Sequence, residues 1–505
     1  MNTTSMRMRK FVNKDFIISV LIVLLVILMG ILLTPFEYKW FYNTDEAIEF
    51  SRLFHVLQGF TLYREVWSDH PPGWTWLLYI WTALFGRSLL AAKILALLLA
   101  AAGIVAFYWI LKLFFDRPTA IFGVLLFSST VRFLPAITVI TIDMPSLALG
   151  IVGILLFLYG LKGKGKSSWL MVLSGIIFAY AMTIKFFTAL LIVVLFGCSK
   201  IIAKHLEPNN PNFKFPWLWL GVILIGFFLL MLTYWPFPYY LLVEFHKNAR
   251  PLYGSETLFK LFKRASQTDL VLLLVCLSSI LLSVIRLRNQ IWRVLIPLVL
   301  SGLMLLQFSV QRPVWWIYYP LIIFPLVWIS CLPFWHFLSQ LRNKNLSHTN
   351  KSKLLLLILM IVWLFPIGQA FWRYSFETMP TVADLRSSTT VSPKQELFES
   401  VQKFSKNNKY ILTDDAMYAV YSQIPIPPEV AVLSNKRVRT EKLEDEFFID
   451  IIERYQPEQI VWIRFTGTLK QPEMQEALEK YGYQSINTTD SKFLHYVRTD
   501  IVNQS

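Results

Sequence analysis

Long apolar runs, separated by short polar segments, occupy most of the chain up to about residue 372. The runs expected to cross a membrane are Phe16–Thr34, Ser88–Phe114, Ala120–Leu134, Pro145–Gly160, Trp169–Ile184, Phe186–Ile202, Trp217–Tyr234, Leu270–Val284, Ile291–Val310, Tyr318–Phe337 and Leu354–Phe371. A helix of about 20 apolar residues spans the roughly 30 Å of hydrocarbon in a bilayer. The pattern therefore predicts a polytopic α-helical membrane protein with about eleven transmembrane helices.

The short, tryptophan-rich segment Trp74–Phe85 decides how these helices are oriented. If it lies on the outer surface or inserts only in part, the later basic clusters fall on the same side as the basic N-terminus, as the positive-inside rule requires. If it crosses fully, the same clusters fall outside. These clusters are Lys112/Arg117, Lys162/Lys164/Lys166, Lys200/Lys204, Arg286/Arg288/Arg293 and Arg342/Lys344/Lys351/Lys353. We therefore expect a surface or partly inserted helix, a cytoplasmic N-terminus and a first external loop over residues 35–87.

The composition changes after about residue 372, where charged residues become frequent and apolar runs shrink to the length of strands. The expected strands are Tyr410–Leu412, Val430–Leu433, Gln459–Ile463 and Phe493–Val497, and the expected helices are Asp415–Ser422 and Glu441–Tyr455. Alternating strands and helices are typical of βαβ units. The pattern predicts a membrane domain over residues 1–372 and a small extracytoplasmic α/β domain over residues 373–505.

Overall composition supports a membrane protein and excludes a nucleic-acid partner. Of the 505 residues 55% are hydrophobic and 16% are charged, and the mean hydropathy is +0.51. The net charge of +16 comes without a long basic block, so the basic residues are expected in cytoplasmic loops beside anionic lipid. The three cysteines have no metal-ligand spacing and read as small buried hydrophobic residues. The expected location is the plasma membrane.

The first candidate residues for chemistry are Asp45 and Glu46, which open a helical pattern in the first external loop. Asn43 or Thr44 could cap this helix. Acidic residues also favour a helix N-terminus for purely structural reasons, so the pair by itself indicates little.

The second candidate is the sequence Asp69-His70-Pro71-Pro72-Gly73, which opens the aromatic segment. Prolines fix the backbone at a helix start, where the missing amide donors cost least. An acid and an imidazole held stiffly beside a bilayer suit a metal, a phosphate or proton transfer, and a solvated turn is the structural alternative.

Two isolated charges interrupt later apolar runs. Asp143 precedes Pro145 at the start of a run, where it could be an interfacial cap, a catalytic acid or both. Lys185 lies where two short runs meet. A lysine in hydrocarbon costs roughly 3 kcal/mol on insertion scales, so Lys185 is either a snorkelling anchor or a ligand for a lipid phosphate.

The loop after Tyr234 carries His246, Lys247 and Arg250 within about one helical turn. A lone surface histidine usually has no special role. With two cations beside it, this segment could bind an anion or supply one ligand to a divalent metal.

The order of these motifs resembles the GT-C superfamily of polyprenyl-phosphate-sugar glycosyltransferases, in the bacterial branch related to protein O-mannosyltransferases and aminoarabinose lipid A transferases. The similarity rests on Asp45-Glu46-Ala47, Gly59-x-x-Leu62-Tyr63, Asp69-His70-Pro71-Pro72-Gly73 and Leu84-Phe85-Gly86-x-Ser88, with Asp414-Asp415, Pro427-Pro428 and Ser434 in the C-terminal region. It runs with good motif order from about residue 40 to 200, and more loosely to about 320. The fold implied is a GT-C membrane domain with an external C-terminal domain.

The resemblance implies a role for each candidate residue. Asp45 corresponds to the catalytic base, with Glu46 beside it, and Asp143 corresponds to the second catalytic acid. Asp69 and His246 correspond to metal ligands of aminoarabinose transferases, although metal dependence varies across the superfamily. The residues expected to bind the donor phosphate are His70, where that branch carries lysine, together with Lys185 and Arg250.

The function implied is an inverting glycosyltransferase that moves a monosaccharide from a polyprenyl-phosphate donor to a protein, glycan or lipid at the external membrane face. Its expected partners are the membrane and the lipid-linked sugar, with a divalent metal ion as a candidate cofactor. One alternative is a transporter or flippase of lipid-linked sugar, in which the intramembrane charges line a path. Such a protein often has matched halves, and the sequence shows no internal repeat. The other alternative is a non-catalytic membrane protein of polysaccharide assembly.

Overall fold

The computed structural model describes residues 3–162, 167–207, 215–234, 238–342, 350–387, 392–406, 408–488 and 490–503. The chain divides into two compact units. The first contains residues 1–36, 93–233 and 254–386, and the second contains residues 37–92, 234–253 and 387–505. Residues 37–92, which contain most of the loop expected to be external, are thus grouped with the C-terminal region, although they are far from it in sequence.

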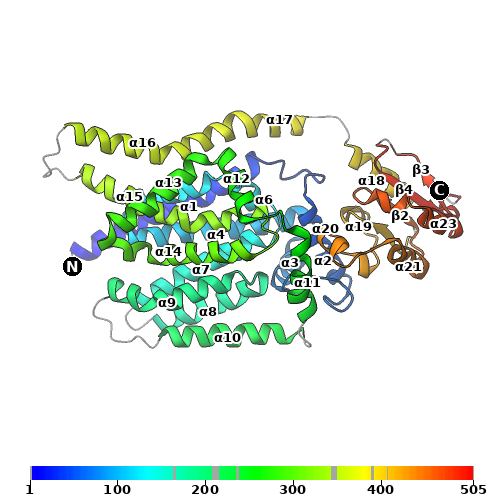
Figure 1. The fold of residues 1–505 in the computed structure, drawn as a ribbon, viewed down its shortest axis with the longest axis horizontal. Helices are drawn as coiled ribbons and strands as arrows, with labels where there is room; N and C mark the ends of the chain where they lie inside the picture. Colours follow the sequence, from blue (N-terminus) through cyan, green and yellow to red (C-terminus); the bar gives the residue numbers. More distant parts are fainter. Residues whose placement is uncertain are drawn as a thin grey trace. The chain divides into compact units, whose positions relative to one another are not determined.

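The first unit is a bundle of helices (Figure 1). Its elements are α1 (Thr3–Leu32), α4 (Leu89–Phe114, from Lys93 on), α5 (Arg117–Ser128), α6 (Phe133–Thr138), α7 (Asp143–Lys162), α8 (Ser167–Ile184), α9 (Thr188–Leu206), α10 (Phe215–Leu232), α12 (Leu258–Thr268), α13 (Leu270–Ile285), η3 (Arg288–Val294), α14 (Leu295–Val310), η4 (Trp316–Tyr318), α15 (Tyr319–Arg342), α16 (Asn350–Arg373), η5 (Tyr374–Thr378) and α17 (Met379–Ser387). Within it, α8 packs against both α7 and α10. The helical stretch that begins with α16 continues to Ser387, beyond the boundary expected near residue 372.

Many of these helices are long and apolar enough to cross a membrane. Among the described residues, seven helices meet this requirement, and the bent pair α12 and α13 would make an eighth. Three shorter apolar helices are Arg117–Ser128, Ser168–Ile184 and Pro216–Leu232. The expectation of a polytopic helical membrane protein is confirmed, whereas the count of eleven spans is not. The basic loop residues Lys164, Lys166 and Lys344 lie outside the described residues.

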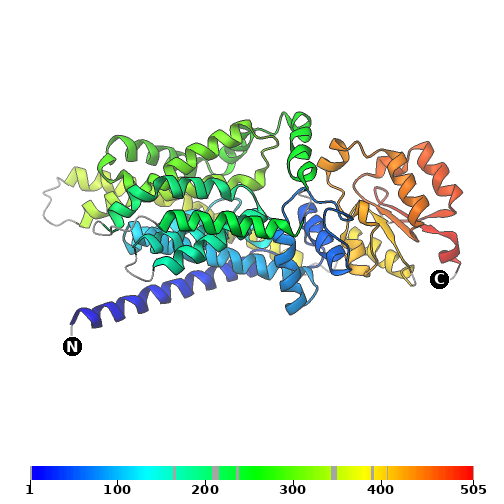
Figure 2. The same cartoon turned by 90° about the horizontal axis from the view of Figure 1, so that it is seen from below.

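Burial separates the helices of the first unit into inner and outer ones. The apolar window of α15 is 83% buried, whereas that of α1 is only 17% buried, and α1 runs along the edge of the bundle (Figure 2). Exposed apolar faces such as that of α1 are suited to lipid, because the helix satisfies its own backbone hydrogen bonds and only apolar side chains contact the lipid tails. In the interior, Gly103 of α4 lies so close to α7 that a Cβ atom would approach Ala148 Cα to 2.8 Å. Small residues allow helix backbones to approach this closely in membrane bundles.

The second unit combines short helices with one small sheet. Its elements are α2 (Thr44–Leu57), α3 (Gly73–Phe85), η1 (Tyr240–Glu244), α11 (Phe245–Ala249), η2 (Arg250–Tyr253), α18 (Pro393–Lys403), β1 (Ile411–Thr413), α19 (Met417–Ser422), η6 (Pro428–Val430), α20 (Asn435–Thr440), α21 (Asp445–Tyr455), β2 (Gln459–Trp462), α22 (Thr466–Leu469), α23 (Pro472–Lys480), β3 (Tyr483–Ile486), β4 (Leu494–Arg498) and α24 (Thr499–Val502). The helix α3 covers the segment Trp74–Phe85, on which the expected orientation of the membrane helices depends. It has 13 residues. At 1.5 Å per residue it is about 20 Å long, which is too short to cross the hydrocarbon.

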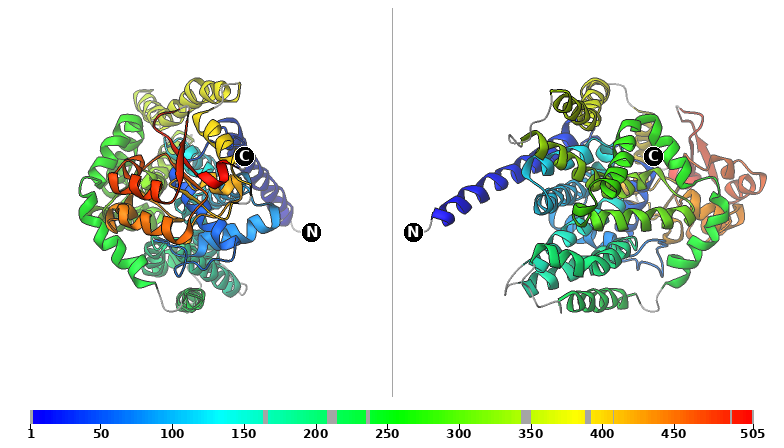
Figure 3. Two further views of the ribbon diagram at one scale, coloured as in Figure 1. Left: turned by 90° about the vertical axis from the view of Figure 1, so that its right-hand side faces the viewer. Right: turned by 60° about the vertical axis from the view of Figure 1, so that its left-hand side comes forward.

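The sheet has the strand order β1-β2-β4-β3. Figure 3 shows its red strands beside the orange and red helices of the C-terminal region. The strands β1 and β2 are parallel and joined through α19, α20 and α21, which confirms the expected βαβ connection. The strands β4 and β3 continue the sheet in antiparallel pairing, with Gln459 opposite Val497 and Tyr483 opposite Arg498. The edge strand β3 was not expected, because its sequence Tyr-Gln-Ser-Ile has no continuous apolar run.

One expected strand is wrong. Residues 430–433, all described and buried, do not pair with another strand. Their carbonyl groups instead accept side-chain hydrogen bonds: Ala431 from Ser51, Val432 from Arg437 and Leu433 from Arg464. A buried backbone must satisfy its hydrogen bonds, and here side chains replace a neighbouring strand.

Candidate functional site

The N-terminus of α2 places one carboxylate at the surface and a second one in a cap. The Asn43 side chain accepts a hydrogen bond from the Glu46 N–H at 2.9 Å, and Glu46 Oε2 accepts one from the Asn43 N–H at 3.0 Å. This is a capping box, which satisfies two N–H groups that the helix itself leaves unpaired. Glu46 is buried in this arrangement, whereas Asp45 is exposed in the first turn. The expected cap of α2 is confirmed.

Nearly two turns further along α2, a buried arginine joins two carboxylates. Arg52 donates to Glu49 Oε1 at 2.7 Å and to Asp69 Oδ1 at 3.0 Å. All three side chains are almost fully buried. Buried charges of this kind persist only when they are paired and hydrogen-bonded. The arrangement fixes the Asp69–His70 corner against α2.

A second cation reaches Asp69 from α20. Lys436 Nζ lies 3.3 Å from Asp69 Oδ2 and donates to His246 Nδ1 at 2.6 Å. His246 Nε2 donates to the Asp69 carbonyl oxygen at 2.9 Å, and the His246 ring is stacked near His70 with a centroid distance of 6.4 Å. We call Asp69, His70, His246 and Lys436 the acid–histidine cluster.

The charges in and beside this cluster control its ionisation. Burial raises the pKa of Glu49 to about 7, against the opposing effect of Arg52. Burial alone would raise the pKa of Asp69, but His70, Lys436, His246 and Arg52 outweigh it and hold this pKa well below its usual value. Burial lowers the pKa of His70 to about 3, and Arg52 acts in the same direction. At neutral pH Asp69 is therefore ionised, and His70 is a neutral imidazole that can donate a hydrogen bond but carries no charge.

Asp69, His70 and His246 also have the spacing of metal ligands, since one ligand atom from each lies within 4.8 Å of the others. However, the Lys436 ammonium is next to the atoms through which Asp69 and His246 would bind an ion. Such a position cannot hold an ammonium and a divalent cation together, because the two charges would repel strongly at low dielectric. The cluster as built does not fit a divalent ion.

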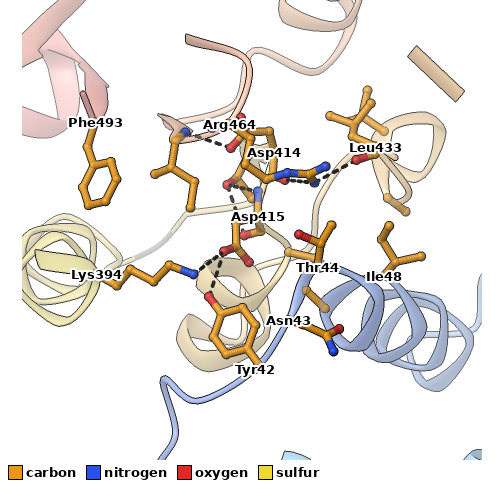
Figure 4. Close-up of a pocket in the computed structure, with 16 residues that line it drawn as sticks. Tyr42, Asn43, Thr44, Ile48, Lys394, Asp414, Asp415, Leu433, Arg464 and Phe493 are labelled. Carbon is orange, nitrogen blue, oxygen red and sulfur yellow. Dashed lines mark hydrogen bonds and ion pairs between the residues drawn. The ribbon is translucent and has the colours of Figure 1, made fainter. Parts of the chain in front are cut away.

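The second unit also contains a cavity of about 390 Å³ beside the start of α2. Figure 4 shows Asn43, Thr44 and Ile48 on one side of it and Asp414, Asp415 and Arg464 on the other. Asp415 accepts hydrogen bonds from the Tyr42 hydroxyl at 2.8 Å and from Lys394 at 3.4 Å. The walls of the cavity therefore combine apolar surface with a few fixed polar groups, which is typical of sites for small molecules.

Asp414 has a structural role next to this cavity. Its carboxylate accepts hydrogen bonds from the N–H groups of Ile463, Arg464 and Phe465 at 2.6–2.9 Å. Burial raises the pKa of Asp414 to about 6, although these three donors act against the rise. The carboxylate thus ties the end of β2 to the loop after β1.

In the first unit, Asp143 and Lys185 form an ion pair. Lys185 Nζ also lies 4.1 Å from the centre of the Tyr318 ring, in a cation–π contact. Asp143 opens α7 and Lys185 lies between α8 and α9, so the two interruptions of the apolar pattern are partners. The pair satisfies charges that would otherwise be costly at membrane depth.

The structure thus brings some, but not all, of the candidate residues into contact with one another. It brings Asp69, His70 and His246 together, and it pairs Asp143 with Lys185. Arg250 is exposed at the start of η2, one turn after His246.

Sequence reasoning missed Glu49, Arg52, Lys394 and Lys436. The spacing of Glu49 and Arg52 on one face of an otherwise buried helix was a usable signal, because i,i+3 residues are neighbours on a helix. No local signal pointed to Lys436, which is separated from Asp69 by 367 positions.

Comparisons with known proteins agree on the fold. Residues 69–235 match the family described as dolichyl-phosphate-mannose-protein mannosyltransferase. The structure resembles ArnT from Cupriavidus metallidurans bound to undecaprenyl phosphate, with a TM-score of 0.63 and 14% identity over 95% of this chain and 97% of ArnT. It also resembles the archaeal oligosaccharyltransferase AglB from Archaeoglobus fulgidus, in complex with an inhibitory peptide and a dolichol-phosphate. There the TM-score is 0.53, with 11% identity over 94% of this chain and 74% of AglB. A search of the curated proteins found no match.

Both solved structures have the GT-C fold, so the fold expected from the order of motifs is confirmed.

Proposed function

We propose that this chain, which has the fold of the GT-C glycosyltransferases, is a membrane enzyme that transfers a sugar from a polyprenyl-phosphate carrier. More specifically, it transfers one monosaccharide to a hydroxyl or amine of a protein, glycan or lipid acceptor, with inversion at the anomeric carbon. The reaction takes place at the external face of the plasma membrane, with the N-terminus in the cytoplasm. The carrier matches the relatives in kind, since ArnT was solved with undecaprenyl phosphate and AglB with dolichol-phosphate.

The observation that carries this proposal is the position of Asp45. Of the three acids in the fully described helix α2, Asp45 alone is exposed, while Glu46 closes the capping box and Glu49 is paired with Arg52. An exposed carboxylate is accessible to substrate and can accept its proton, whereas Glu46 and Glu49 are buried. We therefore assign the general base to Asp45 and a supporting, cap-forming role to Glu46.

The chemistry follows from this assignment. The Asp45 carboxylate removes the proton from the acceptor group as that group attacks the anomeric carbon. The bond between this carbon and the phosphate oxygen breaks, and the polyprenyl phosphate leaves with both electrons. The developing negative charge on the phosphate requires donors or cations nearby. Within the second unit, His70 can supply a neutral N–H and Arg250 a positive charge. Lys185, in the first unit, is a separate candidate for the same role.

The cavity beside α2 is the proposed place for the acceptor. Thr44 and Ala47, which line it, lie one position before and two positions after Asp45. Its polar groups Asp415, Lys394 and Tyr42 form a fixed set of donors and acceptors that can orient a polar molecule.

The test is Asp45→Asn, assayed in membrane vesicles that receive radiolabelled polyprenyl-phosphate sugars. We expect transfer to fall at least about a hundredfold, since general bases contribute roughly 10²–10⁴-fold, while the variant remains folded. The matched control is Glu473→Gln, which removes an exposed carboxylate from the first turn of α23 and should leave transfer unchanged. Full transfer by Asp45→Asn would remove this residue from the mechanism. Label that crosses the membrane without joining any acceptor would instead indicate a transporter.

A further inference from the structure

The acid–histidine cluster contains a cation that belongs to the protein itself. Lys436 Nζ lies 3.3 Å from Asp69 Oδ2 and 2.6 Å from His246 Nδ1, and it is 4.7 Å from the centre of the Phe245 ring. Its side chain is 13% exposed. A lysine held this closely by a carboxylate, an imidazole and an aromatic face occupies a built cation site.

The hydrogen bonds of His246 show which of its two ring nitrogens could bind a metal ion. A carbonyl oxygen can only accept, so the contact between His246 Nε2 and the Asp69 carbonyl places the imidazole proton on Nε2. The lone pair is then on Nδ1, and this lone pair accepts from the Lys436 ammonium, which can only donate. A metal ion would need the same Nδ1 lone pair.

Both carboxylate oxygens of Asp69 also have cationic partners within the protein. Its Oδ2 atom faces Lys436, and its Oδ1 atom accepts from the Arg52 guanidinium at 3.0 Å. Two cations therefore already compensate the Asp69 and Glu49 carboxylates. A divalent ion in this place would have to displace the ammonium rather than join it.

We infer that Lys436 is a built-in substitute for a divalent metal, and that its ammonium excludes such an ion from Asp69, His70 and His246. The lysine comes from α20, so the C-terminal region supplies a charge to the first external loop and fixes the Asp69–His70 corner by this contact. Because the cation is covalently part of the chain, sugar transfer needs no added metal. This last consequence rests on the proposed function, whereas the exclusion of metal does not.

The experiment measures metal directly on the purified full-length protein, prepared without a polyhistidine tag and equilibrated with Zn²⁺ or with Co²⁺. Bound metal is counted by mass spectrometry of the elements, and the Co²⁺ samples are examined for visible ligand-field absorption. Wild type should retain no ion above background. Lys436→Ala should gain about one ion per chain, because the three ligands become available, and the double variant Lys436→Ala/His246→Ala should lose that gain.

The matched control is Arg439→Ala, which removes an exposed cation from the same helix and should gain nothing. Lys436→Met is a second variant, since its apolar chain can keep the contact with Phe245 if the alanine variant does not fold. Retention of about one ion per chain by wild type, with ligand-field absorption in the Co²⁺ sample, would overturn the inference, and this arm needs no cluster variant to fold. Folded Lys436→Ala and Lys436→Met proteins that bind no metal would also overturn it.

Activity provides a separate readout. A chelator should leave wild-type transfer unchanged, and transfer abolished by chelator and restored by Zn²⁺ would contradict the inference. If no sugar transfer is found under any condition, the proposed function fails, while the metal measurement still decides the role of Lys436.

Discussion

Arg52 offers a sharp test of how the second unit is held together, through the substitution Arg52→Met. Arg52 is 1% exposed and donates to Glu49 at 2.7 Å and to Asp69 at 3.0 Å. Methionine keeps much of the length of the side chain and removes its charge. Asp69 retains Lys436 in the variant, so the main loss falls on Glu49, which is left without its arginine.

The magnitude follows from the loss of the buried pair. Burial raises the pKa of Glu49 from 4.5 to about 7 with the guanidinium in place, so wild-type Glu49 is already about half protonated at pH 7. Further proton uptake by Glu49 in the variant therefore adds little at this pH. The main cost is the lost partner of Glu49, and we expect the roughly 3–5 kcal/mol found when one partner of a buried pair is removed.

The sign of the pH dependence also follows. Wild type and variant both lose stability as pH rises from 4.5 to 7, because folded Glu49 holds a proton that the unfolded chain releases. Above pH 7 folded wild type releases this proton and the variant does not, so the difference between wild type and Arg52→Met should grow between pH 7 and pH 9. The adjacent histidines are present in both proteins, and their contribution largely cancels in the difference.

The assay is thermal unfolding in detergent or nanodiscs, followed by tryptophan fluorescence at pH 7 and pH 9. At roughly 2 °C per kcal/mol, we expect the unfolding temperature at pH 7 to fall by about 6 to 10 °C. The matched control is Arg454→Met, because Arg454 also bridges two carboxylates, Glu429 at 2.8 Å and Asp450 at 2.7 Å, but is 45% exposed. Exposed pairs contribute about 1 kcal/mol or less.

The reasoning is refuted if Arg52→Met is no more destabilising than Arg454→Met, or if its effect is the same at both pH values. A second variant distinguishes loss of charge from loss of shape. Glu49→Gln should be neutral or stabilising when added to Arg52→Met, because it removes the unpaired acid, whereas in wild type it removes a charged hydrogen bond and destabilises.

Three further perturbations test other parts of the structure. Asn43→Ala should lower the free energy of unfolding by about 1 kcal/mol and speed amide exchange in the first turn of α2, because the capping box is lost. Asn43→Ser should retain the cap, and equal exchange in both variants would contradict this. Burial lowers the pKa of His495 to about 4, so the unfolded chain takes up a proton at this residue before the folded chain does. The free energy of unfolding should therefore fall by about 2 kcal/mol as the pH is lowered from 7 to 5. His495→Gln should flatten this dependence in unfolding curves. Lys185→Met should weaken binding of a fluorescent polyprenyl phosphate by roughly 10–100-fold, as expected for a lost charged hydrogen bond. The exposed Lys260→Met should not weaken it, and equal affinity in the two variants would leave Lys185 with a role in the ion pair alone.

The sequence by itself determined the membrane class and much of the local structure. A run of apolar residues forms a spanning helix because its own composition sets the free energy of transfer into lipid and its own backbone satisfies every hydrogen bond. The cap at Asn43 was equally readable, since both partners of a capping box lie within four positions. The βαβ connection followed from local alternation, and the order of motifs gave the GT-C fold.

Tertiary structure alone decided which distant groups meet. Residues 430–433 are as apolar as a strand, yet their carbonyls are taken by Ser51, Arg437 and Arg464. Lys436 meets Asp69 across 367 positions. Neither contact leaves a local pattern, because the free energy of a buried charge depends on the partner that packing brings to it and hardly on its neighbours in the chain. The motifs could therefore indicate Asp69, His70 and His246 as candidates, but only the folded chain could place Lys436 among them.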